Sequence, residues 1–234
     1  PDNGYPITTT ISPEGSRVSP GSRPDAPTIE IYGGSMGFGW GVTDGETVGD
    51  ILARKTGAKV INRAAGGYGS LQALMIMQKV AKQWTKKVAK PSALVYLQAT
   101  HHMNRSAGEP SWLLSNERNN PRNGKMVGIP YARFDNRDKF VMKPAQRYWE
   151  FPLREHSALI NMAEQAWVKF SWAISDAEML RGQAELIRRM SDLTQKHGVK
   201  LYVIAVYSQT YRFKDLREAV RDPNGECHEL CVSG

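Results

Sequence analysis

A serine set among glycines offers the clearest chemistry in this sequence. The stretch "TIEIYGGSMGFGWG" (28–41) places Ser35 after a short apolar run, with four glycines in the seven residues 33–39. A serine hydroxyl attacks a carbonyl only when it is exposed on a tight turn, close to a base and to donors for the oxyanion. Glycines permit such a turn and leave room for a substrate. The stretch therefore predicts either a nucleophilic Ser35 or a loop whose backbone cradles a ligand.

The known nucleotide-binding loops do not fit this stretch. A dinucleotide-binding loop reads Gly-x-Gly-x-x-Gly, whereas the order here is Gly34-x-x-Gly37-x-Gly39, and the Gly-Lys-Ser/Thr of a P-loop is missing. Asn62 and Arg63 stand where a ribose-binding fold would offer an acidic residue after its second strand. We therefore expect no cofactor, and the nucleophile interpretation of Ser35 is favoured.

Two further loops follow apolar runs and could complete a site. "RAAGGYGS" (63–70) follows the apolar run 58–62, and "THHMNR" (100–105) follows the run 93–99. The N–H of Ser35 is a natural oxyanion donor, and a second donor could come from Gly66 or Gly67. A third donor would have to be a side chain after the run 93–99.

The hydrophobic pattern alternates between strands and helices. Apolar runs predict strands at 28–32, 58–62, 93–99 and 199–207, and a helix ended by Gly57 lies between the first two. We expect a helix with Ser70 as its N-cap, helical structure over 154–197 with a new helix from Asp176, and a stop at Gly198. This order predicts an α/β fold: a three-layer α/β/α sandwich with a mostly parallel, doubly wound (flavodoxin-like) sheet. The three loops should then meet at the carboxyl edge of the sheet.

The domain organisation follows from composition. Residues 1–27 are rich in Pro, Gly, Ser and Thr, which indicates an extended N-terminal arm, and residues 28–234 form one α/β domain. Residues 100–150 look irregular and are predicted to be a basic loop insertion. A short helix, "FKDLREAV", is expected near the end of the chain.

Charge and cysteine content limit the possible partners. The net charge is +8, and residues 118–147 hold eight Arg or Lys against two Asp. Such a segment either binds an anionic polymer or is simply a solvated loop. The usual nucleic-acid motifs are missing, so no specific nucleic-acid partner is expected. No apolar run approaches the ~18–20 residues of a membrane span. Cys227 and Cys231 flank His228, but we expect two thiols or a disulfide there and no metal.

The two glycine-containing stretches resemble a known superfamily. "YGGSMGFGWGVTDGET" and "VINRAAGGYGSLQAL" are similar to the first two sequence blocks of the SGNH (GDSL-type) hydrolases, a group of esterases, lipases and acetylesterases. Many members read Gly-Asp-Ser-x-x-x-Gly-x-Gly-Val and then Val-x-Asn-x-Gly-x-x-Gly-Tyr-Gly. The resemblance covers residues 28–76, about a fifth of the chain. It implies that Ser35 is the nucleophile and that the N–H groups of Ser35 and Gly67 form part of the oxyanion hole.

The chain departs from the family pattern around this nucleophile. Gly34 stands where the family usually has Asp, and "ATHHMNR" stands where it commonly shows Asn-Asp. His101 then falls at the position of the oxyanion Asn and His102 at that of the Asp, while Asn104 is a further candidate donor. Gly34, Tyr68, His102 and Asn104 are predicted to line the substrate side. His101 and His102 could also be ordinary loop histidines.

The catalytic base is the largest gap in the resemblance. The family ends in Asp-x-x-His, and no such block follows residue 200. Asp222 and His228 could serve, with Asp222 orienting the histidine, although they are six residues apart rather than three. The block could instead lie beyond Gly234 in a longer parent chain, or the chain could be a member without hydrolytic activity.

Two functions therefore stay open from the sequence. The first is a serine ester hydrolase or O-acyl (acetyl) esterase or transferase acting on small-molecule, carbohydrate or lipid esters. The second is a catalytically degenerate binding or scaffold protein that uses residues 118–147 to engage an anionic partner. No targeting segment is visible in the sequence, and a periplasmic or secreted location is favoured over a cytoplasmic one.

Overall fold

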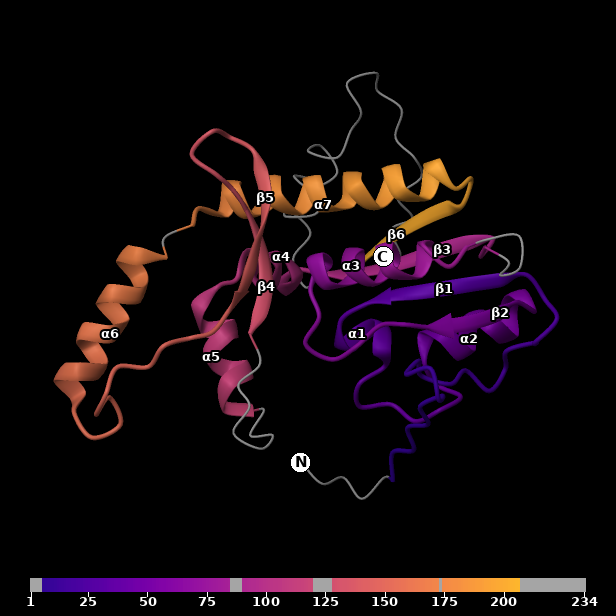
Figure 1. The fold of residues 1–234 in the computed structure, drawn as a ribbon. Coiled ribbons are helices and arrows are strands. Elements are labelled where there is room, and N and C mark those ends of the chain that lie inside the picture. Colours follow the sequence, from indigo (N-terminus) through magenta and orange to yellow (C-terminus); the bar gives the residue numbers. More distant parts are fainter. Residues whose placement is uncertain (1–5, 85–89, 120–127, 173, 207–234) are drawn as a thin grey trace.

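Four parallel strands form the central sheet of this protein (Figure 1). The computed structural model describes residues 6–84, 90–119, 128–172 and 174–206. The sheet order is β2-β1-β3-β6, so β1 lies between the next two strands of the chain. The strands span Thr28–Gly33 (β1), Lys59–Asn62 (β2), Ala93–Ala99 (β3) and Lys200–Val206 (β6), close to the ranges that the apolar runs predict.

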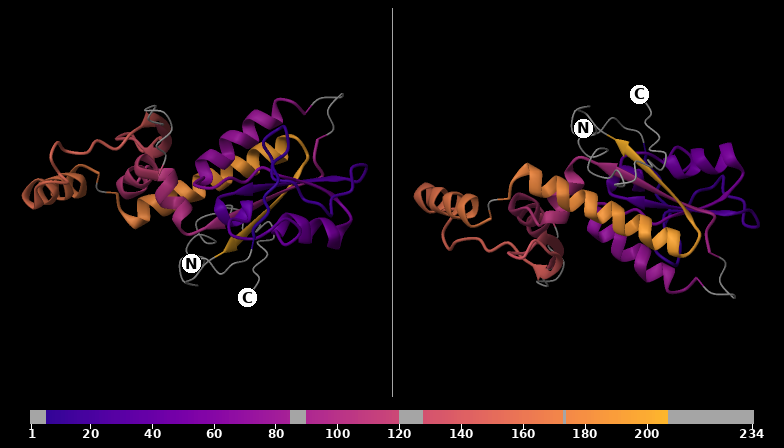
Figure 2. Two further views of the ribbon diagram at one scale, coloured as in Figure 1. Left: turned by 90° about the horizontal axis from the view of Figure 1, so that it is seen from below. Right: turned by 90° about the horizontal axis from the view of Figure 1, so that it is seen from above.

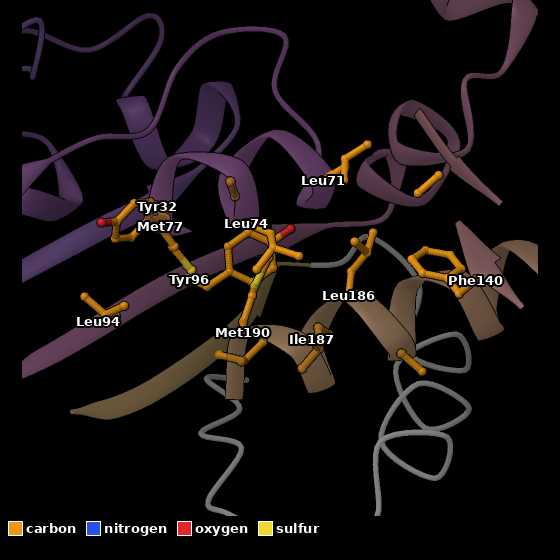
Figure 3. Close-up of a cluster of buried hydrophobic side chains, with 14 of the residues drawn as sticks. Tyr32, Leu71, Leu74, Met77, Leu94, Tyr96, Phe140, Leu186, Ile187 and Met190 are labelled. Atoms are coloured by element: carbon orange, nitrogen blue, oxygen red, sulfur yellow. The ribbon is translucent and has the colours of Figure 1, made fainter. Parts of the chain in front are cut away.

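Helices cover both faces of the sheet, which confirms the predicted three-layer α/β/α fold. On one face, α3 (Ser70–Ala81) and α7 (Asp176–Lys196) pack against β1, β3 and β6. Leu74 of α3 and Met190 of α7 meet Tyr96 of β3 in this core (Figure 3). On the other face, α2 (Val48–Thr56) places Ala53 against Ile31 and neighbouring strand residues. All seven residues of β3 are buried, as expected for a strand covered on both faces.

The helix ends follow local sequence signals, with one exception. Gly57 ends α2 at φ 67° and α7 begins at Asp176, both as predicted, and Ser175 is the N-cap of α7. The prediction that Ser70 caps α3 is wrong. Gly69 occupies the N-cap position, and the Ser70 hydroxyl is buried, 2.5 Å from the Tyr96 hydroxyl. A buried partner on β3 therefore outweighs the local capping preference of Ser70.

The described parts of residues 100–150 are largely regular rather than irregular. They contain α4 (His101–Ala107), α5 (Pro110–Asn119) and an antiparallel hairpin of β4 (Ile129–Phe134) and β5 (Phe140–Gln146). The hairpin turn is held by Asp135, whose carboxylate accepts from the N–H groups of Arg137 and Lys139. The many polar side chains hide the strand pattern in the sequence, because only Ala132 and Phe140 of the hairpin are buried, in contact with α7.

The N-terminal arm contains only isolated bridges in its described part, as its composition suggests, but it packs on the domain. Arg17 is 2% exposed, and its backbone pairs with Asn62 at the end of β2. At the opposite end of the molecule, α6 (Ala158–Ser171) lies apart from the sheet (Figures 1 and 2). Within the described ranges we find no helix with the length and apolar character that a membrane crossing requires.

Candidate active site

The end of β1 is the point where the three predicted loops meet. After Gly33 the chain turns directly into a one-turn helix, α1 (Ser35–Phe38). A Cβ placed on Gly34 would lie 2.5 Å from His102 Nε2 of α4 and 2.9 Å from the carbonyl oxygen of Tyr68. The segments after β1, β2 and β3 are therefore in van der Waals contact at Gly34, as the sheet topology predicts.

This contact explains the departure from the family pattern at Gly34. The resemblance leads one to expect Asp at this position, yet no side chain fits, because His102 and Tyr68 already fill the space. The small residue before the serine and the histidine after β3 are therefore spatially matched.

Ser35 is the first residue of α1 and is half-buried. Its hydroxyl makes no hydrogen bond with any described residue, and neither does its N–H. The first N–H groups of a helix have no acceptor within the helix, so they are available to a ligand. The neighbouring Met36 side chain is 47% exposed, which places this turn at the surface.

The loop after β2 is fastened to α1 by side-chain and backbone hydrogen bonds. The Asn62 amide donates to the Gly37 carbonyl (2.9 Å), and the N–H of Ala65 donates to the Gly33 carbonyl (3.2 Å). Gly67 has φ 82°, a left-handed conformation that favours glycine, and its N–H makes no hydrogen bond within the described residues. The loop thus brings a second uncommitted backbone donor to the edge where Ser35 lies.

His102 is held by a buried network beneath this loop. It is 1% exposed, and its Nδ1 lies 3.0 Å from the Tyr96 hydroxyl and 3.3 Å from the backbone nitrogen of Ala99. The Tyr96 hydroxyl in turn lies 2.5 Å from Ser70 Oγ, and Ser70 donates to Gln183 (2.7 Å). Hydrogen bonds from β3, and through it from α3 and α7, thereby fix the orientation of the His102 ring.

Burial sets the protonation state of His102. Its Nδ1 lies within hydrogen-bond distance of the Tyr96 hydroxyl and of the Ala99 N–H, deep in the core. Burial, followed by the charges of His101 and Arg105, lowers the pKa of His102 to about 3, so the ring is neutral near pH 7. Nε2 is buried with no partner within the described residues, and it faces Gly34. His102 therefore packs against the turn at Gly34 and supports it.

An open groove with a volume of about 870 Å³ runs beside α1 and α4. His101 and Asn104 line it together with Met36, and β6 ends at its edge with Val206. The Asn104 side chain makes no hydrogen bond with any described residue, so its amide is free to donate. Burial and the nearby Arg105 lower the pKa of His101, which favours its neutral form. His101 and Asn104 belong to helix α4, whereas the sequence analysis expected them in a loop.

Arg105 and two tryptophans belong to the site, although the sequence analysis did not identify them. The Arg105 guanidinium donates to the Tyr68 carbonyl (3.1 Å) and stacks 4.3 Å from the ring centroid of Trp112. Trp40 lies next to Gly66, and Trp112 lies next to Gly67. The i, i+3 spacing of His102 and Arg105 was the available signal, because it places both side chains on one face of α4.

Arg17 is a further missed residue, and it holds the far end of the nucleophile loop. Its guanidinium donates to the carbonyls of Phe38 and Gly39 and to the carboxylate of Asp44. An arginine in a Pro- and Ser-rich segment gives no sequence signal of burial. The N-terminal arm is thus part of the support of the candidate site.

Several predicted residues lie outside the described part of the chain. Asp222 and His228 fall in residues 207–234, so their roles stay predictions. Part of the basic segment 118–147 is also outside, and within its described part Arg133 donates to the Ala107 carbonyl and stacks on two aromatic rings. Among the described residues there is no group of three His, Cys, Asp or Glu side chains that could hold a metal ion.

Comparisons with known proteins give a distant structural likeness. No family model matches the chain, and no curated protein matches it. Among solved structures, the chain is similar to an aspartate-to-alanine mutant of esterase AlinE4, with 12% identity, a TM-score of 0.41, and 86% of this chain and 69% of the other covered. A serine-to-alanine mutant of AlinE4 gives 13% identity, the same coverage and a TM-score of 0.39. AlinE4 itself, described as an SGNH-hydrolase family esterase, gives 16% identity and a TM-score of 0.30 over 90% of this chain and 87% of the other. These values are too low to assign a family or an activity.

Proposed function

We propose that this protein is a serine ester hydrolase or O-acyl transferase with Ser35 as its nucleophile. One observation carries the proposal: the Ser35 hydroxyl, the Ser35 N–H and the Gly67 N–H are uncommitted within the described residues, at one edge of the sheet. In contrast, the side chains that hold these loops donate hydrogen bonds: Asn62 to the Gly37 carbonyl and Arg105 to the Tyr68 carbonyl. A hydroxyl with two free backbone donors on rigid supports suits acyl chemistry.

The proposed reaction begins when Ser35 Oγ attacks an ester carbonyl carbon and a base takes its proton. The N–H groups of Ser35 and Gly67 hold the resulting oxyanion, with Asn104 or His101 as the side-chain donor. When the tetrahedral intermediate collapses, the bond to the alcohol breaks and the base returns the proton to the leaving oxygen. Water, or an acceptor hydroxyl in a transferase, then releases the acyl group by the same steps.

The base in this proposal is His228, oriented by Asp222. His102 is not the proposed base, because its ring is buried and its pKa, lowered to about 3, makes it a weak proton acceptor near pH 7. We assign it instead to positioning the Gly34–Ser35 turn. Tyr68 contributes its carbonyl to the same support through Arg105.

Carbohydrate or lipid esters are the proposed substrates. Trp40 is 75% exposed beside Gly66, and Trp112 borders Gly67, so aromatic surface lies next to the proposed oxyanion donor. Indole rings offer flat apolar surface to a sugar ring or an acyl chain. We expect substrate to enter along the groove that His101 and Asn104 line.

A binding or scaffold role is the second candidate function. Within the described residues, no carboxylate acts on His101 or His102, so neither histidine belongs to a base pair that would activate Ser35. In that case the groove binds a ligand without turning it over.

Turnover of a short-chain aryl ester by the full chain tests the first function. Ser35→Ala removes the nucleophile, so kcat/KM should fall at least about 10³-fold. Ser92→Ala, an exposed serine just before β3, is the matched control and should keep its activity. Equal turnover by the wild type and Ser35→Ala would exclude Ser35 as nucleophile.

A further inference from the structure

Helix α6 lies at the end of the molecule away from the sheet (Figures 1 and 2) and carries a row of exposed apolar side chains. In this row Phe170 is 86% exposed, Leu159 76%, Met162 69% and Trp167 58%. Two exposed alanines, at positions 163 and 166, lie between them. The spacing i, i+3, i+4, i+7, i+8, i+11 places all six residues on one face of a helix. We call Leu159, Met162, Ala163, Ala166, Trp167 and Phe170 the apolar stripe.

A polar cluster on the other face of α6 fixes which way the stripe points. Glu164 is fully buried and accepts hydrogen bonds from the Tyr148 hydroxyl (2.6 Å) and the N–H of Phe151, and it forms an ion pair with Arg154 (2.6 Å). These contacts bind the helix to the loop that precedes it, so the stripe is held outward rather than turned toward its own loop.

Exposing the apolar face of a helix to water is unfavourable in free energy. A helix of 14 residues is marginal in water on its own, and most helical stability in proteins comes from packing of an apolar face. On α6 the only buried residue is Glu164, so the apolar stripe contributes little burial against the described residues. An uncovered row of large apolar side chains indicates an interaction surface.

The stripe is complementary to a second copy of itself. Leu159 and Phe170, Met162 and Trp167, and Ala163 and Ala166 are three pairs whose members lie equally far from the midpoint between residues 164 and 165. When two copies of α6 pack antiparallel about a two-fold axis at this midpoint, each residue of the stripe meets its pair partner in the other copy. The two alanines then lie where the helices cross, and the large side chains pack on both sides.

Charge permits this pairing. Glu164 and Lys169 are the ionisable residues of α6, and Glu164 is already paired with Arg154. In the antiparallel arrangement Lys169 meets Ile160 of the partner copy, so no like charges face each other. A membrane surface fits less well, because helices that lie on lipid carry many Lys or Arg on the polar face and α6 carries only Lys169.

The area suits a weak dimer. At about 150–250 Å² for a full aromatic side chain, the exposed parts of Trp167 and Phe170 offer roughly 200–360 Å² in each copy. Leu159 and Met162 add to this, but the stripe stays below the roughly 800 Å² that each partner gives to a standard interface. We propose that the apolar stripe of α6 joins two copies of this chain as an antiparallel helix pair, with a Kd of about 1–100 µM.

Sedimentation velocity of the full chain over a concentration series tests the proposal. We expect a monomer–dimer equilibrium that strengthens with added salt, because salt screens the repulsion between two chains of charge +8. Met162→Glu should raise the Kd at least about 30-fold, whereas Gln165→Lys, an exposed position off the stripe, should leave it within about twofold. A monomer at all concentrations, or a dimer that Met162→Glu does not weaken, would overturn the proposal.

The register is tested by cross-linking, which does not depend on a destabilising substitution. In a background with Cys227→Ser and Cys231→Ser, a mixture of Ala163→Cys and Ala166→Cys chains should form a disulfide-linked dimer under mild oxidation. A mixture of Ala163→Cys and Ala158→Cys chains should not, because positions 158 and 163 are not pair partners and Ala158 is an exposed residue off the stripe. Equal cross-linking in both mixtures would contradict the antiparallel register. Binding to anionic vesicles without dimer formation would assign the stripe to a membrane instead.

Discussion

The surroundings of Gly34 and the surface of α6 differ in how tightly their side chains are packed. At Gly34 a side chain is missing because His102 and the Tyr68 carbonyl already fill its place, and the neighbouring loops are tied together by hydrogen bonds. On α6, large side chains such as Phe170 are present with nothing from the described chain to cover them. The comparison suggests that the contacts around Gly34 are complete in one chain, whereas the apolar stripe of α6 requires a second one. Substitutions should therefore have large effects in the first region and small ones in the second.

The largest effect on stability is expected for Gly34→Ala. The new methyl group would lie under 3.0 Å from His102 Nε2 and Tyr68 O, and overpacking of this kind costs about 1–3 kcal/mol. We expect this loss in the free energy of unfolding by urea, together with loss of ester turnover. Gly66→Ala is the control, since only the Trp40 ring, 3.6 Å away, approaches its Cβ position.

A double variant sharpens the same test. His102→Ala removes one of the two obstacles, so Gly34→Ala should cost less in that background than in the wild type. Strict additivity of the two changes would contradict the spatial match between Gly34 and His102.

The next effect is a pH dependence of stability due to His102. Its pKa is about 3 in the folded chain and about 6.5 when unfolded, so below pH 6.5 the unfolded state binds a proton that the folded state does not. Stability from this group is fully present above pH 6.5 and falls as the pH is lowered toward 3, by up to about 1.4 kcal/mol per pH unit.

Urea unfolding at pH 7 and pH 5 measures this slope. We expect His102→Gln to flatten the loss of stability on acidification, while His156→Gln, an exposed histidine, keeps the wild-type slope. An unchanged slope in His102→Gln would mean that His102 is not buried as a neutral ring.

The smallest effect on chain stability is expected on α6. Leu159→Ser shortens a side chain that is 76% exposed, so the free energy of unfolding measured at a concentration well below the dimer Kd should change by no more than about 0.5 kcal/mol. A loss above about 1.5 kcal/mol in this dilute sample would show that the stripe is covered within its own chain.

The sequence predicted the sheet and the meeting of its loops better than the details of the site. The apolar runs of β1 and β3 and the glycine ends of helices are local signals, and parallel topology then fixes which loops converge. The irregular interpretation of residues 100–150 failed because the hairpin buries only Ala132 and Phe140, too few to show a pattern.

Side-chain roles were harder to predict because they depend on long-range packing. The His102 ring is held through Tyr96 by Ser70 and Gln183, which lie far away in the sequence, so no local signal separates it from a loop histidine. Arg17 gave no local sign of its contacts with the loop after Ser35. The assignment of Ser70 as a cap failed for the same reason.

Mass spectrometry after treatment of the full chain with a fluorophosphonate probe tests the central claim most directly. If Ser35 is an activated nucleophile beside free oxyanion donors, the probe should add once per chain at the peptide that contains Ser35, and Ser35→Ala should remove the label. A wild-type chain that stays unlabelled, or that is labelled equally well with Ser35→Ala, would contradict acyl chemistry at this serine.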